Sequence, residues 1–208
     1  MADNDTETRD HWWWRPGWRP GRSFYTWHFL MEDQAALHEF VQRVRLALDG
    51  VAVLDPIPPQ WLHMTTQGIG FADEVSEADL AVISPAVAMQ IADLSPIEVR
   101  LGPLVVDAEG VHLPARPDAA LTEARAAIRR GIGQVWGADR VPETEEFRPH
   151  VSLAYANTSG EPLNLVRETL GQYRDVIPVT LTRVSLIDLN RDEGEYRWRT
   201  VRVLGLGN

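Results

Sequence analysis

Two short stretches of the sequence place a histidine two residues before a hydroxyl side chain. The first pairs His63 with Thr65, and the second pairs His150 with Ser152. In a strand, side chains two residues apart lie on one face, so each imidazole would share a face with a hydroxyl. Two imidazoles facing one cleft can divide proton transfer, because one can accept a proton from an attacking water while the other donates a proton to the departing oxygen. The hydroxyls could then donate hydrogen bonds to the oxygens of a phosphate.

Both stretches are predicted to be strands. Around the second motif, Val151, Leu153 and Tyr155 alternate with polar residues, which is typical of a strand buried on one face. Arg148 precedes His150 by two residues and would lie on the same face. A cation, an imidazole and a hydroxyl would therefore point the same way.

Five further side chains are weaker candidates for substrate binding. Arg148 either holds a phosphate or pairs with Glu145 or Glu146. Gln67 follows Thr65 by two residues and would share its face. Three aromatic side chains either stack on a base or pack in the core, where aromatic residues supply much of the burial; these are Tyr25, Trp27 and Trp61.

The other histidines and the absence of cysteine limit the alternatives. His28 and His112 lack the motif spacing and are expected to be structural, and no role is assigned to His11 or His38. Without cysteine there is no disulfide, no thiolate metal site and no cysteine nucleophile. A zinc site usually has three or four protein ligands, and the sequence marks no third ligand beside the two motif histidines. No metal or other cofactor is therefore expected.

Composition limits the class of partner. The 208 residues are 44% apolar, which is ordinary for a globular protein, and no apolar run approaches the length of a membrane span. The acidic, polar residues 1–10 do not resemble a secretory signal, so a cytoplasmic protein is expected. The net charge of −10 argues against a long nucleic-acid groove, although all the cations are arginine, which binds phosphate well. A strand end or a small phosphate ester is compatible with this charge.

The order of predicted elements indicates an α+β fold. The first half is predicted to contain a strand (24–31), a helix capped by Asp33 and closed by Gly50, a short strand (51–54), the His63 strand to about Phe71, and a helical segment (74–94). A hairpin (97–106 and 111–113) follows, and then a helix capped by Asp118 and closed by Gly137. The chain is predicted to end with the His150 strand, a helix from Pro162, and a last hairpin (176–189 and 195–204). Ser84 before Pro85 predicts that the 74–94 segment is two helices. Each half of this order contains one histidine strand, which suggests a pseudo-twofold.

Residues 1–22 are predicted to be an arm that precedes a single domain over residues 23–208. The arm contains four tryptophans, several arginines and Pro-Gly pairs that prevent a regular element. One interpretation is a stacking platform for bases and phosphates. The other is that the tryptophans pack on the body or on a second subunit, which avoids a large apolar patch in water.

The two motifs resemble the paired signatures of the two-histidine (2H) phosphoesterase superfamily. The stretch 147–153, Phe-Arg-Pro-His-Val-Ser-Leu, is similar to the second motif of its 2′-5′ RNA ligase-like branch, and 61–71 is similar to the first. Thr66 departs from the hydrophobic residue usual there. The resemblance implies a bilobal α+β fold with antiparallel sheets flanking a central cleft and helices outside. It also implies metal-independent chemistry on 2′,3′-cyclic phosphates or 2′-5′ linkages, with His63, Thr65, His150 and Ser152 as the catalytic residues.

Two other functions remain open on the sequence alone. One is a non-catalytic module that binds a nucleotide or an RNA end in the same cleft. The other is an interaction protein that docks a partner through its tryptophan-rich arm. The pair of motifs favours the enzyme, because binding alone needs no pair of titrating groups.

Overall fold

A computed structural model of the chain describes residues 5–142 and 146–207. Its strands are β1 (Phe24–Leu30), β2 (Leu54–Pro56), β3 (His63–Phe71), β4 (Ile97–Leu101), β5 (Val105–Asp107), β6 (Gly110–Arg116), β7 (His150–Ala156), β8 (Ile177–Leu181), β9 (Arg183–Asn190) and β10 (Arg197–Gly205). They form two antiparallel sheets. The first has the order β10-β9-β1-β3, and the second has the order β2-β7-β6-β4-β8, with β5 paired to β6.

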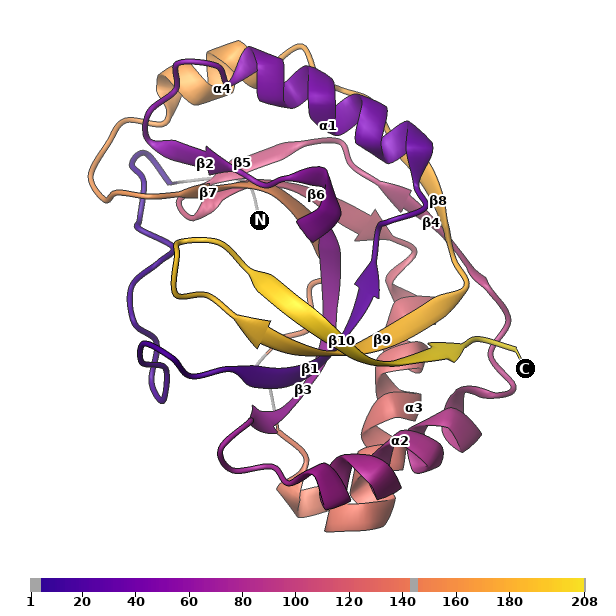
Figure 1. The fold of residues 1–208 in the computed structure, drawn as a ribbon. Coiled ribbons are helices and arrows are strands. Elements are labelled where there is room, and N and C mark those ends of the chain that lie inside the picture. The colour runs from indigo at the N-terminus through magenta and orange to yellow at the C-terminus, as the bar shows by residue number, and fades with distance from the viewer. Residues whose placement is uncertain (1–4, 143–145, 208) are drawn as a thin grey trace.

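Helices cover the outer sides of the two sheets (Figure 1). They are α1 (Ala35–Ala47), α2 (Glu77–Ile91), α3 (Asp118–Trp136) and α4 (Asn164–Leu170), with short 3-10 turns at Pro59–Trp61 and Ala138–Arg140. The pair α1 and α4 packs together, and α1 contacts β8 of the second sheet. The pair α2 and α3 packs together and contacts β10 and β3 of the first sheet. The predicted α+β fold, with antiparallel sheets inside and helices outside, is confirmed.

The chain passes repeatedly between the two sheets. It leaves the first sheet after β1, enters the second at β2, returns to the first at β3, and crosses again before β4 and after β8. Each structural half is therefore built from both halves of the sequence. The two histidine strands lie in different sheets, β3 at an edge of the first and β7 inside the second.

The predicted break at Ser84 and Pro85 is wrong, because α2 continues through both residues. Ser76 caps the N-terminus of α2: its hydroxyl accepts from the backbone N–H of Asp79, while the Asp79 carboxylate accepts from the backbone N–H of Ser76. A proline inside a helix costs about 3 kcal/mol. Burial of one apolar side of α2 offsets that cost, and its buried apolar residues are Leu80, Ile83, Val87 and Ile91.

Several other predicted boundaries also differ from the structure. The predicted 97–106 strand is divided into β4 and β5, and Asp118 is the first residue of α3 and makes no side-chain capping hydrogen bond. The short strand is β2, so it begins at Leu54, and its proline is tolerated because β2 is an edge strand. The 176–189 segment is divided at Thr182, since β8 belongs to the second sheet and β9 to the first. Asp33 pairs with Arg183 and does not cap α1.

Two of the aromatic candidates belong to the core. Tyr25 is 8% exposed and Trp27 is fully buried. Both lie on the face of β1 that is opposite to His28, so they pack inside the molecule, and the prediction that they bind substrate is wrong for this structure. No helix in the described ranges is long and apolar enough to cross a membrane.

Candidate active site

The two motif histidines are held in the same way. His63 begins β3 and donates its Nδ1–H to the carbonyl oxygen of Trp61 at 2.8 Å. His150 begins β7 and donates its Nδ1–H to the carbonyl oxygen of Arg148, also at 2.8 Å. Since a carbonyl oxygen can only accept, both rings carry a proton on Nδ1, and Nε2 is the nitrogen left to exchange a proton with a substrate.

The surroundings of the two rings differ. His63 is 8% exposed and stacks on His28 with 4.6 Å between ring centroids, whereas His150 is exposed. Burial lowers the pKa of His63 to about 4, against a smaller opposing effect of the Trp61 carbonyl. The charges of His150 and His11 lower that pKa further. At neutral pH, His63 is therefore uncharged.

A β-bulge in β3 separates the side chains after the first motif. Trp27 of β1 opposes Gln67 and the next residue, His28, opposes Thr65, which leaves Thr66 without a partner. Thr65 consequently stays on the face of His28 and is exposed, while Gln67 turns to the opposite face. The prediction that Gln67 shares the face of Thr65 is wrong, because it assumed unbroken alternation.

On that opposite face, Gln67 has a structural role. It is 2% exposed and donates to the carbonyl of Pro142 at 2.7 Å. Its side-chain oxygen accepts from Arg125 and Arg129, each at 3.2 Å. These contacts tie β3 to α3 and to the loop before the second motif.

A second bulge lies in β7 and moves an aromatic side chain into the site. Ser152 and Ala154 of β7 lie opposite two consecutive residues of β6, so Leu153 between them has no cross-strand partner. Tyr155 therefore turns to the face of Ser152. The prediction that Tyr155 shares the buried face of Val151 is wrong for the same reason.

A cavity of about 640 Å³ opens beside the second motif. Both His150 and Ser152 line it, and Arg148 lies on its wall while paired with Glu146. Both interpretations of Arg148 therefore fit the structure, and the other predicted partner, Glu145, lies outside the described residues. The volume is in the range of pockets that hold one small ligand.

A cavity of about 50 Å³ lies beside the first motif. His63 and Trp61 line it, and the Trp61 ring packs against Trp198 at 4.7 Å. Tyr155 lines both cavities. The structure therefore brings the two motif strands together but places a partition between the His63 and His150 cavities, and Thr65 lines neither of them.

The two histidines expected to be structural both lie beside the site. His112 lines the larger cavity, and its ring centroid is 5.2 Å from that of His150. It opposes Ser152 across the β6–β7 pair. No sequence spacing could have signalled these neighbours, because β1 and β6 reach the motif strands only through the order of strands in each sheet.

The arm also contributes to the site. His11 lines the larger cavity and Trp12 lines the smaller one. Trp12 and Trp18 pack on aromatic residues of the body, as the packing interpretation predicts. The rings of Trp13 and Trp14 are 48% and 45% exposed. The sequence offered a signal for this contribution, since four tryptophans in one segment rarely remain in water.

The fold is shared with known proteins. A family model described as the 2′-5′ RNA ligase superfamily matches residues 32–193. The structure is similar to that of TT0787 of Thermus thermophilus, with a TM-score of 0.66, 15% identity, and coverage of 89% of this chain and 98% of that one. It is also similar to Escherichia coli LigT complexed with 3′-AMP, with a TM-score of 0.63, 14% identity, and coverage of 90% and 99%.

Another solved domain shows the same fold at still lower identity. The MHV ns2 PDE domain matches with a TM-score of 0.55 and 10% identity, over 81% of this chain and 99% of that one. No curated protein sequence matches at a significant level. The family match spans most of the chain and both motifs, and the α+β architecture agrees with it. The chain belongs to the 2′-5′ RNA ligase superfamily, within the 2H phosphoesterases.

Proposed function

We propose that the chain is a metal-independent phosphoesterase. It acts on the 2′,3′-cyclic phosphate or 2′-5′ phosphodiester of an RNA end or small nucleotide. The observation that carries this proposal is the matched hydrogen bonding of His63 and His150, which leaves Nε2 as the exchanging nitrogen in both rings. A protein that only bound nucleotides would not need two imidazoles prepared in this way.

The difference in burial supports one assignment of the two roles. Because burial keeps His63 neutral, it is suited to accept a proton, and exposed His150 is suited to donate one. In hydrolysis of a cyclic phosphate, a water oxygen forms a bond to phosphorus and its proton passes to Nε2 of His63. The bond from phosphorus to the ribose oxygen breaks, and that oxygen takes the proton from Nε2 of His150. Thr65 and Ser152 would donate to the non-bridging oxygens.

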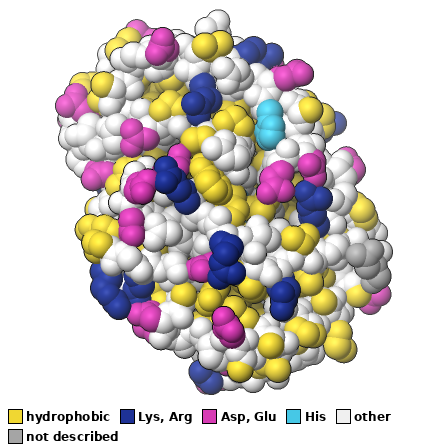
Figure 2. Space-filling model, in the orientation of Figure 1, with side chains coloured by type: hydrophobic (Ala, Val, Ile, Leu, Met, Phe, Trp, Pro, Cys, Tyr) yellow, Lys and Arg dark blue, Asp and Glu magenta, His cyan; other side chains and the backbone are white. Residues whose placement is uncertain are grey.

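The charge of the chain favours a small substrate. On the face in Figure 2, basic and acidic side chains are interspersed, and the net charge is −10. A protein that follows a long polyanion needs a continuous excess of cations. LigT has been solved with 3′-AMP, with ATP and with NADP+. By analogy, the ligand here is a nucleotide or the end of a short RNA.

A turnover screen tests the proposal. Adenosine 2′,3′-cyclic phosphate and a 2′-5′-linked dinucleotide are incubated with the full chain in the presence of EDTA. Within the described residues, no cluster of three or more His, Asp or Glu side chains is arranged to hold a metal ion. We expect turnover to persist with EDTA, and His63→Ala and His150→Ala each to lower it about 10²–10⁴-fold. His38→Gln is the control, since His38 bonds the carbonyl of Met31.

Two results would overturn the mechanism. Turnover that is lost with EDTA and restored by one divalent cation would replace it with Lewis-acid catalysis. Full turnover in either histidine variant would remove that residue from the mechanism.

A second candidate is a module that binds nucleotides without turning them over. The low exposure of His63, and the partition between it and His150, favour this alternative. Saturable binding of 3′-AMP with no turnover of any cyclic or 2′-5′-linked substrate would support it.

A further inference from the structure

The partition between the two cavities is formed largely by the N-terminal arm. The His11 ring is 7% exposed and lies flat on Tyr155, with 4.0 Å between centroids and 13° between the planes. The next residue, Trp12, contacts the rings of Tyr155 and Tyr196, each at 5.2 Å. His11 faces the larger cavity and Trp12 the smaller one.

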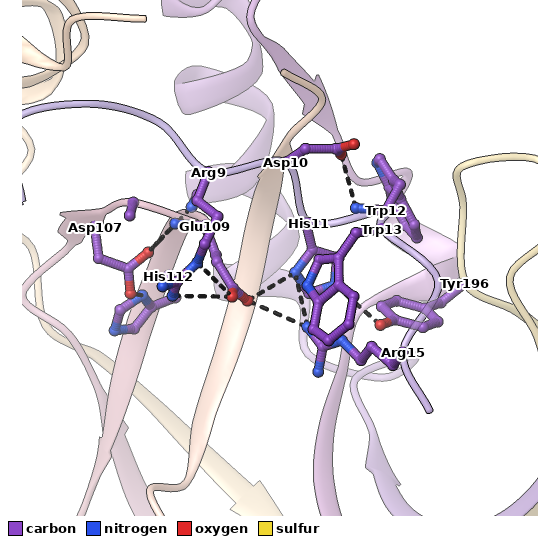
Figure 3. Close-up of polar contacts among 12 residues, drawn as sticks. Arg9, Asp10, His11, Trp12, Trp13, Arg15, Asp107, Glu109, His112 and Tyr196 are labelled. Carbon is purple, nitrogen blue, oxygen red and sulfur yellow. Dashed lines mark hydrogen bonds and ion pairs between the residues drawn. The ribbon is translucent and has the colours of Figure 1, made fainter. Parts of the chain in front are cut away.

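Hydrogen bonds of His11 join the two sheets (Figure 3). Nδ1–H donates to the carboxylate of Glu109, next to β6 in the second sheet, at 3.2 Å. The hydroxyl of Tyr196, beside β10 in the first sheet, donates to Nε2 at 2.9 Å. Burial raises the pKa of Tyr196 and lowers that of His11, while the bond from His11 holds the pKa of Glu109 at about 2. Near neutral pH, the bridge therefore joins an ionised carboxylate, a neutral imidazole and a protonated phenol.

The arm is also fixed through its backbone. The N–H of His11 donates to the carbonyl of Ala156 at 2.8 Å, and Arg191 donates to the carbonyl of His11 at 2.9 Å. Upstream, Glu7 and Pro162 form an antiparallel bridge. Because these contacts involve backbone atoms, a change of the His11 side chain would leave the arm attached.

Two of the three bridge residues, His11 and Tyr196, are outside the part of the chain that matches the family. The match covers residues 32–193, so His11 precedes it and Tyr196 follows it. The larger cavity also has an acidic wall, with two arginines against four carboxylates among its described residues: Arg116, Arg148, Asp107, Glu109, Asp118 and Glu146. A chain of several phosphates entering beside His150 would meet the bridge on one side and carboxylates on the others.

We propose that the Glu109–His11–Tyr196 bridge determines substrate length, and restricts the site to a single nucleotide carrying a cyclic phosphate. This inference rests on the proposed function. The bridge lies where the arm bounds the larger cavity, with His11 flat on Tyr155, so further nucleotides could not extend past this side of the cavity without displacing the bridge. His11 and Tyr196 are thus specificity-determining residues that take no part in proton transfer.

Length selectivity in two variants tests the inference. Tyr196→Phe removes one hydroxyl and keeps the ring, and His11→Ala removes the imidazole. Trp13→Ala is the matched control, because this arm residue is half exposed and lines neither cavity. The substrates are adenosine 2′,3′-cyclic phosphate and a pentanucleotide ending in a 2′,3′-cyclic phosphate. Binding of 3′-AMP and of a 3′-phosphorylated pentanucleotide is measured by calorimetry on the same proteins.

The intact chain should prefer the mononucleotide by about 10-fold or more in kcat/KM and in affinity. Tyr196→Phe should reduce this preference about 3–10-fold, the usual effect of one hydrogen bond, and His11→Ala at least as much. Trp13→Ala should leave it unchanged. An intact chain that prefers the pentanucleotide, or folded variants that keep the original preference, would overturn the inference. If the affinities follow the expected pattern but nothing turns over, the bridge stands and the proposed catalysis fails.

Discussion

His63 and His150 have the same hydrogen-bond pattern but different surroundings. Each donates Nδ1–H to a carbonyl two residues earlier, yet His63 is buried on His28 while His150 is exposed. Only the neutral form of His63 can accept a proton, and burial extends its neutral range to lower pH. In the proposed mechanism, this asymmetry would give the two imidazoles distinct roles without an orienting carboxylate for either.

The acid limb of the pH profile tests this assignment. Because burial lowers the pKa of His63 to about 4, the neutral base should persist well below pH 6.5. We expect kcat/KM on a cyclic nucleotide to stay high as the pH falls through 6.5, and to decline only as it approaches 4. A decline centred near pH 6.5 would contradict His63 as the base in this environment. An NMR titration of the imidazole resonances, assigned with His63→Ala, gives the same quantity without turnover.

The two hydroxyls should matter less than the imidazoles. Thr65→Val and Ser152→Ala each remove one donor from a phosphate that Arg148 or backbone groups also contact, so we expect about 10–10²-fold losses in kcat. Melting temperatures of the variants control for stability. A loss as large as that of the histidine variants would require a larger role for the hydroxyl.

At the level of elements, β-bulges limit how far along each motif strand the facing of side chains can be predicted from the sequence. His63, Thr65, His150 and Ser152 were predicted as site residues from their spacing and a family resemblance, and the two strands predicted to carry them exist. Alternation fails after each motif, because unpaired residues in β3 and β7 reverse the faces that follow. A bulge depends on which strand lies opposite, so the sequence of one strand does not contain it.

Long-range contacts set a similar limit for the arm. Its packing was predictable from its tryptophans, but its position was not. The position depends on hydrogen bonds from residues 8–11 to segments near residues 108, 156 and 161, and on the Trp18 ring packed against Phe71. The segment near residue 162 also lies beside the arm, although most of the sequence separates this segment from the arm.

Removal of residues 1–22 should destabilise the chain. Trp12 and Trp18 pack on the body, and Arg22 lies 3.6 Å over the ring of Phe71 and pairs with Asp73. Full burial of two such side chains would be worth on the order of 3–6 kcal/mol, and the partial burial of Trp12 and Trp18 is worth a fraction of this. The truncated chain should therefore unfold at lower urea concentration. Unchanged stability and mass, together with weaker 3′-AMP binding, would instead support the arm as a stacking platform.

At the scale of the molecule, the fold is preserved where the sequence is not. The solved relatives are 10–16% identical to this chain, yet the matches cover most of each one. Which residues form strands and helices follows from periodicity, so the α+β class was predictable. The repeated crossing between sheets was not, because periodicity contains no information on which strands pair. This crossing brings β3 and β7 into contact and thereby assembles the site.

Three buried imidazoles couple the stability of the whole molecule to pH. Burial lowers the pKa of His63 to about 4, lowers that of His28 well below its usual value, and lowers that of His11. In the unfolded chain all three titrate near pH 6.5. Between pH 6.5 and about 4 the unfolded state therefore binds more protons than the folded state. The free energy of unfolding must then fall as the pH falls through this window.

Urea unfolding at pH 7 and pH 5 measures this loss. For His63 alone, the shift corresponds to about 2 kcal/mol lost between these two pH values, and His28 and His11 add to the loss. Carboxylates with a lowered pKa, such as Glu109, lose their contribution mainly below pH 4.5, so they affect this comparison little. His28→Leu should unfold with a smaller difference between pH 7 and pH 5, because it removes one of the three groups. His38→Gln should keep the full difference, and equal stability of the original chain at both pH values would show that these imidazoles are not buried in solution.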